Sequence, residues 1–390
     1  MAETTTMLQL TCRKVIALLV CSGILASPSS PAGDTDLGGL SKLRYRSIDI
    51  MKFTKDTLRQ QPSELAIDRL LDCLKANFNL THVAVAIPLD AQADYPQPKP
   101  GPASAEEFTK RLCAGIHARG FKVIHRGTWC GIEGLYGFPH CVGPRRFPAG
   151  TAEAVLKGAA DGSLRPESWL AKTYSYIIEH PDIFADGDLW AVLPERTEGI
   201  FNEATSFLPH TKPGVAQHYA SFFIDLAAVS AEAFTKIGKK VEVGLTANNF
   251  SEVKSGWLPQ SIFANAGIVA FDHYGITHTP QELDSDLRAV FDRRGKLPLF
   301  HQEWGDYWNA KMPEAERCAY LKSILDVWCA LAAEGKLIGF NYWGGWQNEG
   351  EGILVNSGTA ADPRYELNAR GKILADYFRT PGGDQPKAER

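Results

Sequence analysis

The sequence predicts an α/β protein folded as a single (β/α)8 barrel, or TIM barrel. Eight short β-rich segments alternate with longer amphipathic segments along the 390 residues, and this alternation is typical of parallel strands joined by helices. Most of the short segments are almost continuously apolar, as strands covered on both faces of a parallel sheet are. Eight such units fit a closed barrel better than an open doubly wound sheet, which needs fewer strands or a second domain.

The predicted strands and helices follow one another in regular order. The strands span residues 45–51, 82–87, 122–126, 189–193, 241–246, 268–271, 297–302 and 337–342. The spacing of apolar residues predicts helices at 67–78, 104–120, 214–239, 279–294, 313–335 and 366–378. The segment 128–187 is long for one strand-to-helix connection and holds two further helical patterns, so we expect it to decorate the mouth of the barrel.

The N-terminal segment predicts export. Arg13 and Lys14 precede a short apolar run that ends in small residues, which is the pattern of a secretory signal peptide. We expect a signal peptide at 1–26, a flexible tether at 27–40, one catalytic domain at 41–380 and a disordered tail at 381–390. The expected location is secreted or periplasmic, without stable membrane insertion after cleavage. A lipid anchor at Cys21 is disfavoured because Val20 is larger than the small residue usual there.

The composition excludes several classes of partner. With 44% hydrophobic and 22% charged residues, the chain is an ordinary globular protein. The net charge of -4 and the scattered Lys and Arg residues disfavour a nucleic-acid partner. No Gly-rich phosphate fingerprint follows the first strand, which disfavours a nucleotide, and no spacing of Cys and His predicts a structural metal.

The cysteines are compatible with an oxidising compartment. Of the eight cysteines, two lie in the signal segment, and an even number of six remains. Cys130 and Cys141 bracket a Gly-rich loop and are the best disulfide candidate. Cys318 and Cys329 fall on one predicted helix, too far apart to bond each other, and the other two are open to interpretation as buried apolar residues.

Polar and aromatic residues follow most of the predicted strands. The carboxyl ends of barrel strands converge on one face, so these residues are expected to meet although they are distant in the sequence. They are His125, Arg126 and Trp129 after strand three, Glu195 after strand four, Asn248 and Asn249 after strand five, Asp272, His273 and Tyr274 after strand six, Glu303 and Trp304 after strand seven, and Trp343 after strand eight.

This set resembles the clan of retaining (β/α)8 glycoside hydrolases that carry an acid/base glutamate after strand four and a nucleophilic glutamate after strand seven. The resemblance extends over the whole mature chain and implies that Glu195 is the acid/base and Glu303 the nucleophile. It also implies that Tyr274 hydrogen-bonds the nucleophile and that Trp343 forms the floor of the subsite for the cleaved sugar. The remaining candidate substrate-binding residues are His125, Trp129, Asn248, Asn249, His273 and Trp304.

The chemistry supports this assignment and also exposes one departure from the clan. Glycosidic cleavage needs two carboxyl groups with opposed pKa values, about 5 to 5.5 Å apart in retaining enzymes. The clan's acid/base residue usually follows an Asn that contacts the sugar 2-hydroxyl, whereas Pro194 stands here and offers neither a side-chain amide nor an N–H. Asn248 or Asn249 is a candidate for the missing hydrogen bond. Glu198 and Glu203 are rival acid/base residues.

Several candidate residues are also open to a structural interpretation. His125 and His273 are equally compatible with substrate contact and with holding neighbouring carbonyls. The tryptophans are large enough to be packing residues, although Gly344-Gly345-Trp346 after Trp343 favours a sugar platform. Arg126 is a candidate partner that keeps Glu303 or another carboxylate at the rim ionised, with a surface arginine as the alternative.

The sequence thus predicts a secreted retaining glycoside hydrolase that cleaves β-linked oligosaccharide or polysaccharide by double displacement, without a metal or organic cofactor. The alternative is a non-catalytic glycan-binding barrel whose acid/base site has degenerated at Pro194. A lyase or aldolase with a buried lysine is disfavoured because no lysine occupies the strand-end positions named above.

Overall fold

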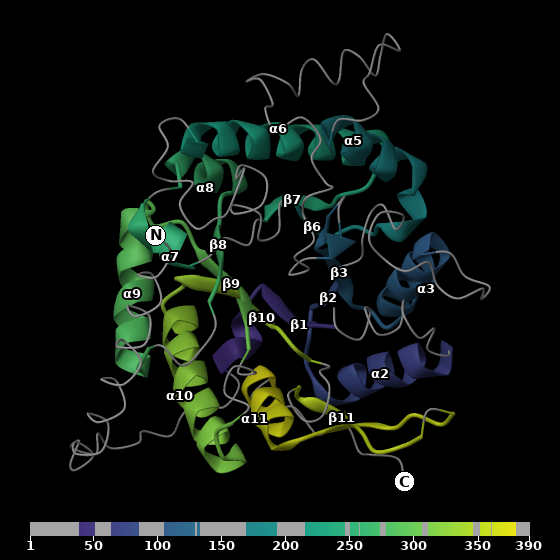
Figure 1. The fold of residues 1–390 in the computed structure, drawn as a ribbon, viewed down its shortest axis with the longest axis vertical. Helices are drawn as coiled ribbons and strands as arrows, with labels where there is room; N and C mark the ends of the chain where they lie inside the picture. Colours follow the sequence, from purple (N-terminus) through teal and green to yellow (C-terminus); the bar gives the residue numbers. More distant parts are fainter. Residues whose placement is uncertain are drawn as a thin grey trace, which may run out of the picture. The chain divides into compact units, whose positions relative to one another are not determined.

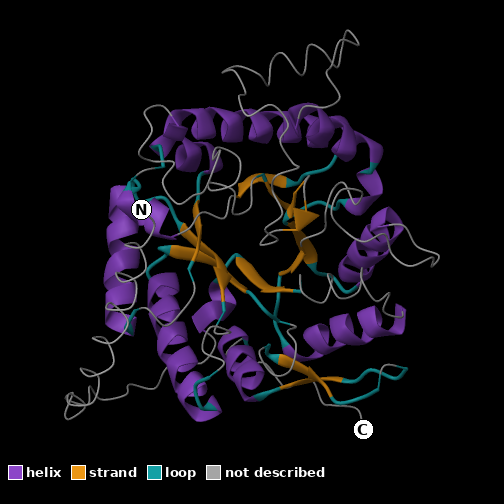
Figure 2. Cartoon of the chain, viewed as in Figure 1, coloured by secondary structure: helices purple, strands orange, loops and turns teal. Residues whose placement is uncertain are grey.

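Eight parallel strands form one curled sheet surrounded by helices, as Figure 1 and Figure 2 show. The computed structural model describes residues 39–50, 64–85, 105–128, 131–132, 169–192, 215–245, 250–256, 258–273, 278–305, 311–345, 352–359 and 361–379. This architecture is the predicted (β/α)8 barrel of the α/β class. In chain order the barrel strands are β1 (Tyr45–Asp49), β2 (His82–Val85), β3 (Lys122–His125), β6 (Leu189–Ala191), β7 (Glu242–Leu245), β8 (Val269–Asp272), β9 (Leu299–Trp304) and β10 (Leu337–Tyr342).

The helices of the described ranges lie outside the ring of strands (Figure 1). They are α2 (Glu64–Asn77), α3 (Ala105–Ala118), α5 (Trp169–Glu179), α6 (Val215–Lys236), α7 (Phe250–Ser255), α8 (Gln260–Ala266), α9 (Pro280–Arg293), α10 (Glu314–Ala333) and α11 (Ala369–Phe378). Helix α9 illustrates why they begin where they do. The Thr279 side chain accepts from the Glu282 N–H while the Glu282 carboxylate accepts from the Thr279 N–H, so this capping box satisfies both donors at the helix start.

The strand order is β7-β6-β3-β2-β1-β10-β9-β8, and all the pairs between adjacent strands in this order are parallel. The hydrogen-bonded order begins at β7 and ends at β8, and α8 contacts both of these strands. Gly244 of β7 has φ +123°, and a Cβ there would approach the Ala266 backbone of α8 to 3.2 Å. Glycine therefore allows α8 to pack tightly beside the two terminal strands.

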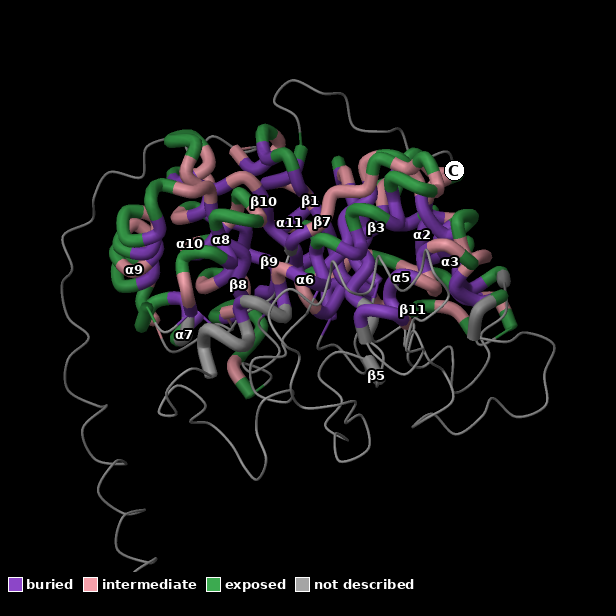
Figure 3. The backbone as a smooth tube through the Cα atoms, turned by 90° about the horizontal axis from the view of Figure 1, so that it is seen from above, coloured by how far each residue is buried: buried purple, intermediate pink, exposed green. Residues whose placement is uncertain are grey.

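The core has two parts, one inside the barrel and one between the strands and the helices. The interior cluster consists of Tyr45, Ala84, Ile124, Leu189, Ala191, Ala270 and Phe300. Their neighbours along the strands, such as Val83, Val123 and Phe271, belong to the larger outer cluster. This alternation follows from the period of two in a strand. Figure 3 shows the strands almost wholly buried, with exposed positions on the outer faces of helices such as α9.

The structure differs from the sequence-based expectation at several boundaries. Glu366, expected in the last helix, lies in the hairpin of β11 (Leu354–Asn356) and β12 (Tyr365–Leu367). A second unpredicted hairpin joins β4 (Gly127–Thr128) to β5 (Gly131–Ile132). Leu40, expected in the tether, lies in the 3-10 helix η1 (Gly39–Lys42) and is fully buried, because it packs into the outer core. The segments 1–38, 133–168 and 380–390 lie outside the described residues.

The described cysteines are Cys73, Cys113, Cys318 and Cys329, and no disulfide joins any two of these four. Cys318 and Cys329 both lie on α10, as predicted, and do not bond each other. Cys73 and Cys113 are buried apolar residues of the outer core, whereas the predicted pair Cys130 and Cys141 lies outside the described residues. Where the chain is described, none of its helices combines the length and apolar character needed to cross a membrane.

Candidate active site

Glu303 lies on β9, the seventh strand of the barrel, at a β-bulge. Between His301 and Trp304, two residues of β9, Gln302 and Glu303, stand opposite the single residue Asn341 of β10. In an unbroken strand Glu303 would share the outward face of His301. The extra residue shifts the alternation and turns the Glu303 side chain toward the barrel axis.

Arg126 holds the Glu303 carboxylate at the carboxyl end of the barrel. Arg126 directly follows β3 and points inward, since it shares a face with Ile124 of the interior cluster. Its Nη2 forms an ion pair with Oε1 of Glu303, and its Nη1 lies 3.2 Å from Oδ2 of Asp49, the last residue of β1. Arg126 is 0%, Glu303 1% and Asp49 2% exposed. Of the alternatives for Arg126, the structure therefore shows the ion pair with Glu303, adds one with Asp49, and excludes a surface arginine.

Two polar side chains, those of Ser47 and Asn341, hold the backbone of the bulge in place. Ser47 Oγ lies 2.7 Å from Oδ1 of Asn341, and the amide of Asn341 donates to the carbonyl of Gln302 at 2.8 Å. All three residues are fully buried. Hydrogen bonds of this kind in a dry interior hold a functional side chain in one geometry.

The environment of Glu303 favours the protonated carboxyl more than water does. Burial, followed by the negative charge of Asp49, raises the pKa of Glu303 well above its ordinary value. The ion pair with Arg126 acts in the opposite direction because it stabilises the carboxylate. Glu303 is thus a buried carboxyl whose protonation state depends on two charged neighbours, which is typical of functional sites.

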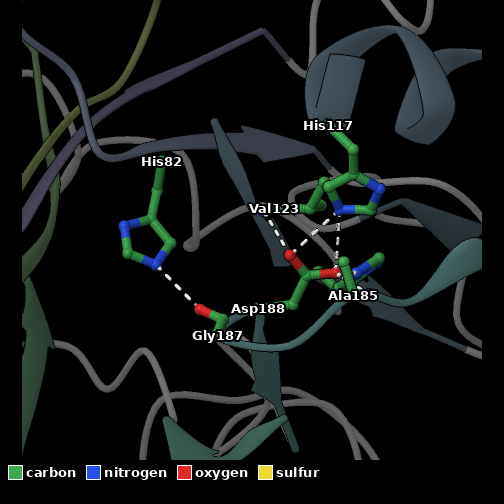
Figure 4. Close-up of polar contacts among 7 residues, drawn as sticks. His82, His117, Val123, Ala185, Gly187 and Asp188 are labelled. Carbon is green, nitrogen blue, oxygen red and sulfur yellow. Dashed lines mark hydrogen bonds and ion pairs between the residues drawn. The ribbon is translucent and has the colours of Figure 1, made fainter. Parts of the chain in front are cut away.

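His125 lies on the outer face of β3, away from the barrel mouth. Its Nε2 is 3.2 Å from Oδ2 of Asp188, which also contacts Nε2 of His117 and accepts from the backbone N–H groups of Val123 and Ala185 (Figure 4). Burial alone would raise the pKa of Asp188, but the hydrogen bonds with His117 and His125 outweigh it and hold that pKa well below its ordinary value. His125 therefore ties β3 to the start of β6, and its expected role in substrate binding is wrong.

Trp304 also faces away from the barrel mouth. It is fully buried, and its ring packs edge-to-face on Trp328 of α10 at 5.2 Å and on Tyr342 at 5.7 Å. The same bulge that turns Glu303 inward turns Trp304 outward. The expectation that Trp304 contacts a sugar is therefore corrected: it is a packing residue of the outer core.

His273 supports the bulge through its backbone. Its N–H donates to the Glu303 carbonyl at 3.0 Å, and its own carbonyl accepts from Nε2 of His301 at 3.1 Å. Its ring packs on Phe250 of α7 and on His278, both at 4.9 Å. Burial, with a smaller effect of His278, lowers the pKa of His273 to about 4. The side chain thus lies against the helix layer, contrary to the expected sugar contact.

Trp343 is brought close to Glu303 by the pairing of β9 and β10. Its N–H donates to the Trp304 carbonyl at 2.7 Å, and a Cβ added to Gly305 would lie 2.6 Å from its carbonyl oxygen and 3.5 Å from its ring. Trp343 is partly exposed. The absence of a side chain at Gly305 lets the Trp343 backbone pass this closely beside the strand end that carries Glu303.

The other expected site residues lie outside the described part of the chain. They are Glu195, Trp129, Asn248, Asn249 and Tyr274. Their roles stay predictions. Among the residues that the structure does describe, no group of three or more His, Cys, Asp and Glu side chains is arranged to hold a metal ion.

Sequence reasoning missed Asp49 as a member of the site. Tyr45, Ser47 and Asp49 alternate along β1, and all three face the interior. An acidic residue at the end of a buried strand is the pattern that singled out Glu303, so the same rule applied to strand one would have found Asp49.

Comparison with known proteins defines the class of fold and no more. No family model and no curated protein matches the sequence. Solved structures of glycoside hydrolases with (β/α)8 barrels do match, over most of the chain. At 11% to 13% identity the similarity establishes a shared fold.

Three bacterial enzymes illustrate the similarity. A GH5 xyloglucanase from Bacteroides ovatus, in complex with a XXXG heptasaccharide, has a TM-score of 0.54 at 13% identity, over 88% of this chain and 77% of its own. A family 5 xyloglucanase from Paenibacillus pabuli has a TM-score of 0.53 at 11% identity, over 87% and 98%. A GH5-4 broad specificity endoglucanase from Clostridium acetobutylicum has a TM-score of 0.53 at 11% identity, over 88% and 99%.

Proposed function

We propose that this protein is a retaining glycoside hydrolase that cleaves β-linked oligosaccharide or polysaccharide. The observation that carries the proposal is the position of Glu303: a buried carboxylate, turned inward by a bulge at the end of the seventh barrel strand and paired with Arg126. A side chain held in this way at the carboxyl face of a (β/α)8 barrel is where catalytic groups of this fold lie.

The proposed reaction has two displacements. The Glu303 carboxylate attacks the anomeric carbon and forms an ester, while the glycosidic C–O bond breaks and the leaving oxygen takes the proton of Glu195. A water then attacks the anomeric carbon and gives its proton to the Glu195 carboxylate, and the ester C–O bond breaks to restore the Glu303 carboxylate. After the glycosidic bond and the ester bond have been broken in turn, Glu303 is again a carboxylate and Glu195 is again protonated.

The names of the similar structures guide the choice of substrate. Two are xyloglucanases and one is an endoglucanase. We therefore infer a β-linked glucan as the first substrate class to test, with Trp343 stacking on the sugar beside Glu303. Trp129, Asn248, Asn249 and Tyr274 are proposed to complete the substrate contacts. The N-terminal segment supports the further proposal that the protein is secreted or periplasmic.

Azide rescue of glutamate variants tests the two catalytic roles separately. With an activated aryl β-glycoside, Glu303→Gly should lose turnover, and azide should restore it with an α-glycosyl azide as product. The reason is that the small anion replaces the missing nucleophile in a single displacement. Glu195→Ala should instead yield a β-glycosyl azide, because azide then attacks the covalent intermediate. Mass spectrometry and NMR of the azide products identify the anomer.

Glu198→Ala is the matched control, since Glu198 is the rival acid/base in the same segment. It should retain wild-type turnover without azide. Rescue of Glu198→Ala but not of Glu195→Ala would transfer the acid/base role to Glu198. Absence of hydrolysis by the wild type across aryl β-glycosides and β-glucans, with binding of a β-glucan retained, would establish the glycan-binding alternative instead.

A further inference from the structure

Asp188 lies on the outer side of the barrel wall and joins three segments of the fold (Figure 4). Its Oδ1 accepts from the Val123 N–H at 2.8 Å and lies 3.0 Å from Nε2 of His117 on α3. Its Oδ2 accepts from the Ala185 N–H at 2.9 Å and lies 3.2 Å from Nε2 of His125. An imidazole nitrogen that bonds an ionised carboxylate is the donor, so each oxygen accepts from one backbone amide and one ring. We call these five residues the Asp188 clamp.

The carboxylate at the centre of the clamp is shielded from water and held in one geometry. Asp188 is 0% exposed, and its own N–H donates to the Ala185 carbonyl at 3.1 Å. The His125 ring also packs on Phe184 at 4.9 Å and on Trp190 at 6.1 Å. Burial opposes ionisation, but the hydrogen bonds of the two rings outweigh it and hold the pKa of Asp188 well below its ordinary value. The clamp is therefore a buried anion that is stabilised by four donors.

The clamp secures one edge of β3, while β2 secures the other. On the β2 side, the N–H of Arg126 donates to the Val85 carbonyl at 2.8 Å. On the β6 side, the register of β3 spans two residue pairs. The Val123 N–H, one position before this register, bonds the Asp188 side chain instead. The clamp thus extends a short strand pairing along the segment that leads to Arg126.

His125 ends β3, Arg126 follows it, and the two side chains point to opposite faces. His125 faces the helix layer and bonds Asp188. Arg126 faces the barrel interior, where its Nη2 pairs with Oε1 of Glu303. Successive side chains of a strand have opposite directions that are both set by the orientation of the backbone. A rotation of the strand about its own axis that releases His125 would therefore also redirect Arg126.

We propose that Asp188 is a positioning residue for Glu303. It holds the His125 end of β3 from outside the barrel, and this fixes the direction from which Arg126 reaches the Glu303 carboxylate. The effect on catalysis rests on the proposed function, whereas the clamp and the ion pair rest on the geometry alone. Asp188 lies on the other side of the strand from Glu303, so it acts through His125 and Arg126.

Two further titratable side chains lie close to the charge of Asp188. Cys113 of α3 is buried, and burial, followed by the charge of Asp188, raises the pKa of its thiol. His82 of β2 bonds the Gly187 carbonyl at 3.2 Å, and burial lowers its pKa to about 4. Both side chains are therefore neutral near pH 7, and neither can replace the Asp188 carboxylate as an anion beside His125.

The pKa of Glu303 measures the ion pair without any substrate. Burial and then the charge of Asp49 raise this pKa, whereas the guanidinium of Arg126 opposes the rise. Protein labelled with carbon-13 at the glutamate carboxyl carbon is titrated by NMR, and the Glu303 resonance is identified by its loss in Glu303→Gln. Asp188→Asn leaves one accepting oxygen in place of two. The pKa of Glu303 should therefore rise by about 1 or more in this variant, because Arg126 is aligned less well.

Variants of the two histidines separate positioning from a general loss of stability. His125→Leu removes the donor next to Arg126 and should raise the pKa of Glu303 as Asp188→Asn does. His125→Gln should return it toward the wild-type value, since its side-chain amide can donate where Nε2 does. His117→Leu is the matched control, because it removes the same kind of bond from the same carboxylate, but on the α3 side. It should lower the free energy of unfolding, measured by urea denaturation, and leave the Glu303 titration unchanged.

Steady-state kinetics on an aryl β-glycoside tests the use of the clamp in the proposed reaction. His125→Leu should lower kcat about tenfold or more and leave KM within about twofold, because Glu303 is misaligned while no substrate contact is lost. The acid limb of kcat/KM should move to higher pH together with the pKa of Glu303. His117→Leu should keep the wild-type kcat and pH profile.

The outcomes separate this inference from the proposed function. An unchanged Glu303 titration in folded Asp188→Asn and His125→Leu overturns the positioning role, whatever the activity. An equal rise in His117→Leu also overturns it, because a general loosening of the fold would then be sufficient. A rise confined to Asp188→Asn and His125→Leu, in a protein that hydrolyses no glycoside, supports the hold of the clamp on the ion pair and overturns the proposed function. If Asp188→Asn does not fold, the comparison of His125→Leu with His125→Gln decides.

Discussion

Both ends of the barrel carry ion pairs, but the pairs differ in their exposure to solvent. At the amino end, Glu242 of β7 accepts from the Tyr45 hydroxyl and from Arg44, both at 2.5 Å, and its side chain is 39% exposed. At the carboxyl end, Arg126 faces two carboxylates, and every group is buried. The Glu242 anion at the amino end is therefore partly solvated, whereas the described ion pairs at the carboxyl end are buried.

Strand β1 contributes to both ends and makes the comparison direct. Tyr45 and Asp49 lie on the same inward face, four residues apart, which is about 13 Å along a strand. Tyr45 stacks on Phe300 at 5.4 Å and meets the edge of His82 at 5.4 Å. These contacts make the amino end a structural part of the barrel, whereas the proposed function places the chemistry at the carboxyl end.

The largest expected effect separates the two glutamates at opposite ends. Glu303→Gln should lower kcat/KM for an aryl β-glucoside at least about 1,000-fold, because the nucleophile is lost. Glu242→Gln should leave kcat/KM within about twofold, since the amide oxygen still accepts from Tyr45. Steady-state kinetics measures both. Equal losses in the two variants would show that Glu303 acts on the fold rather than on the reaction.

The next effect separates the two tryptophans on neighbouring strand ends. Trp304→Ala should lower the free energy of unfolding by about 3 to 5 kcal/mol, because a fully buried ring is removed from between Trp328 and Tyr342. Trp343→Ala, at a partly exposed position, should cost less stability and raise KM instead. Urea denaturation and kinetics on a β-glucan oligosaccharide distinguish the two. The reverse pattern would assign the sugar platform to Trp304.

The sequence predicts where the strands lie, but not which side chains of each strand point into the barrel. The eight strands are predictable because a strand covered on both faces is apolar throughout, and β10 has the predicted bounds. The same continuous apolar character hides which face is inward. His125 was therefore expected at the mouth, whereas the alternation of Val123 and Ile124 places it outside.

The bulge in β9 also makes side-chain directions unpredictable from the sequence, because it reverses the alternation of side chains after His301. Nothing in His301-Gln302-Glu303-Trp304 marks an extra residue, since neither Gly nor Pro is present. The chemistry of a carboxylate at a strand end was enough to select Glu303, but the direction of Trp304 depends on the bulge. The role of Asp49 depends on a contact with Arg126 between distant segments, which no local pattern reports.

The third effect tests the amino end by pH. Burial lowers the pKa of His82 to about 4, although its hydrogen bond to the Gly187 carbonyl opposes this. The unfolded chain, with an imidazole pKa of about 6.5, binds the proton first as the pH falls. His82 therefore has no effect on the free energy of unfolding above about pH 6.5. Between pH 6.5 and 4 it should lower that free energy by about 3 kcal/mol.

Urea denaturation of the wild type and His82→Gln at several pH values measures this contribution. The variant should lose less stability between pH 6.5 and 4 than the wild type does. His273 lies at the carboxyl end, and its pKa is also about 4. His273→Gln should therefore also reduce the loss of stability between pH 6.5 and 4, independently of His82→Gln. Identical slopes for His82→Gln and the wild type would mean that folding does not lower the pKa of His82.

The smallest expected effect tests whether the amino end is only structural. Tyr45→Phe removes the hydroxyl that donates to Glu242 at 2.5 Å and keeps the ring that stacks on Phe300. Because Glu242 stays partly solvated and paired with Arg44, no buried group loses its last partner. The free energy of unfolding should therefore fall by only about 1 kcal/mol, with kcat/KM unchanged. A loss of activity larger than the loss of stability would show that the two ends of β1 are coupled, since Asp49 lies on the same face of that strand, and the division between a structural end and a catalytic end would fail.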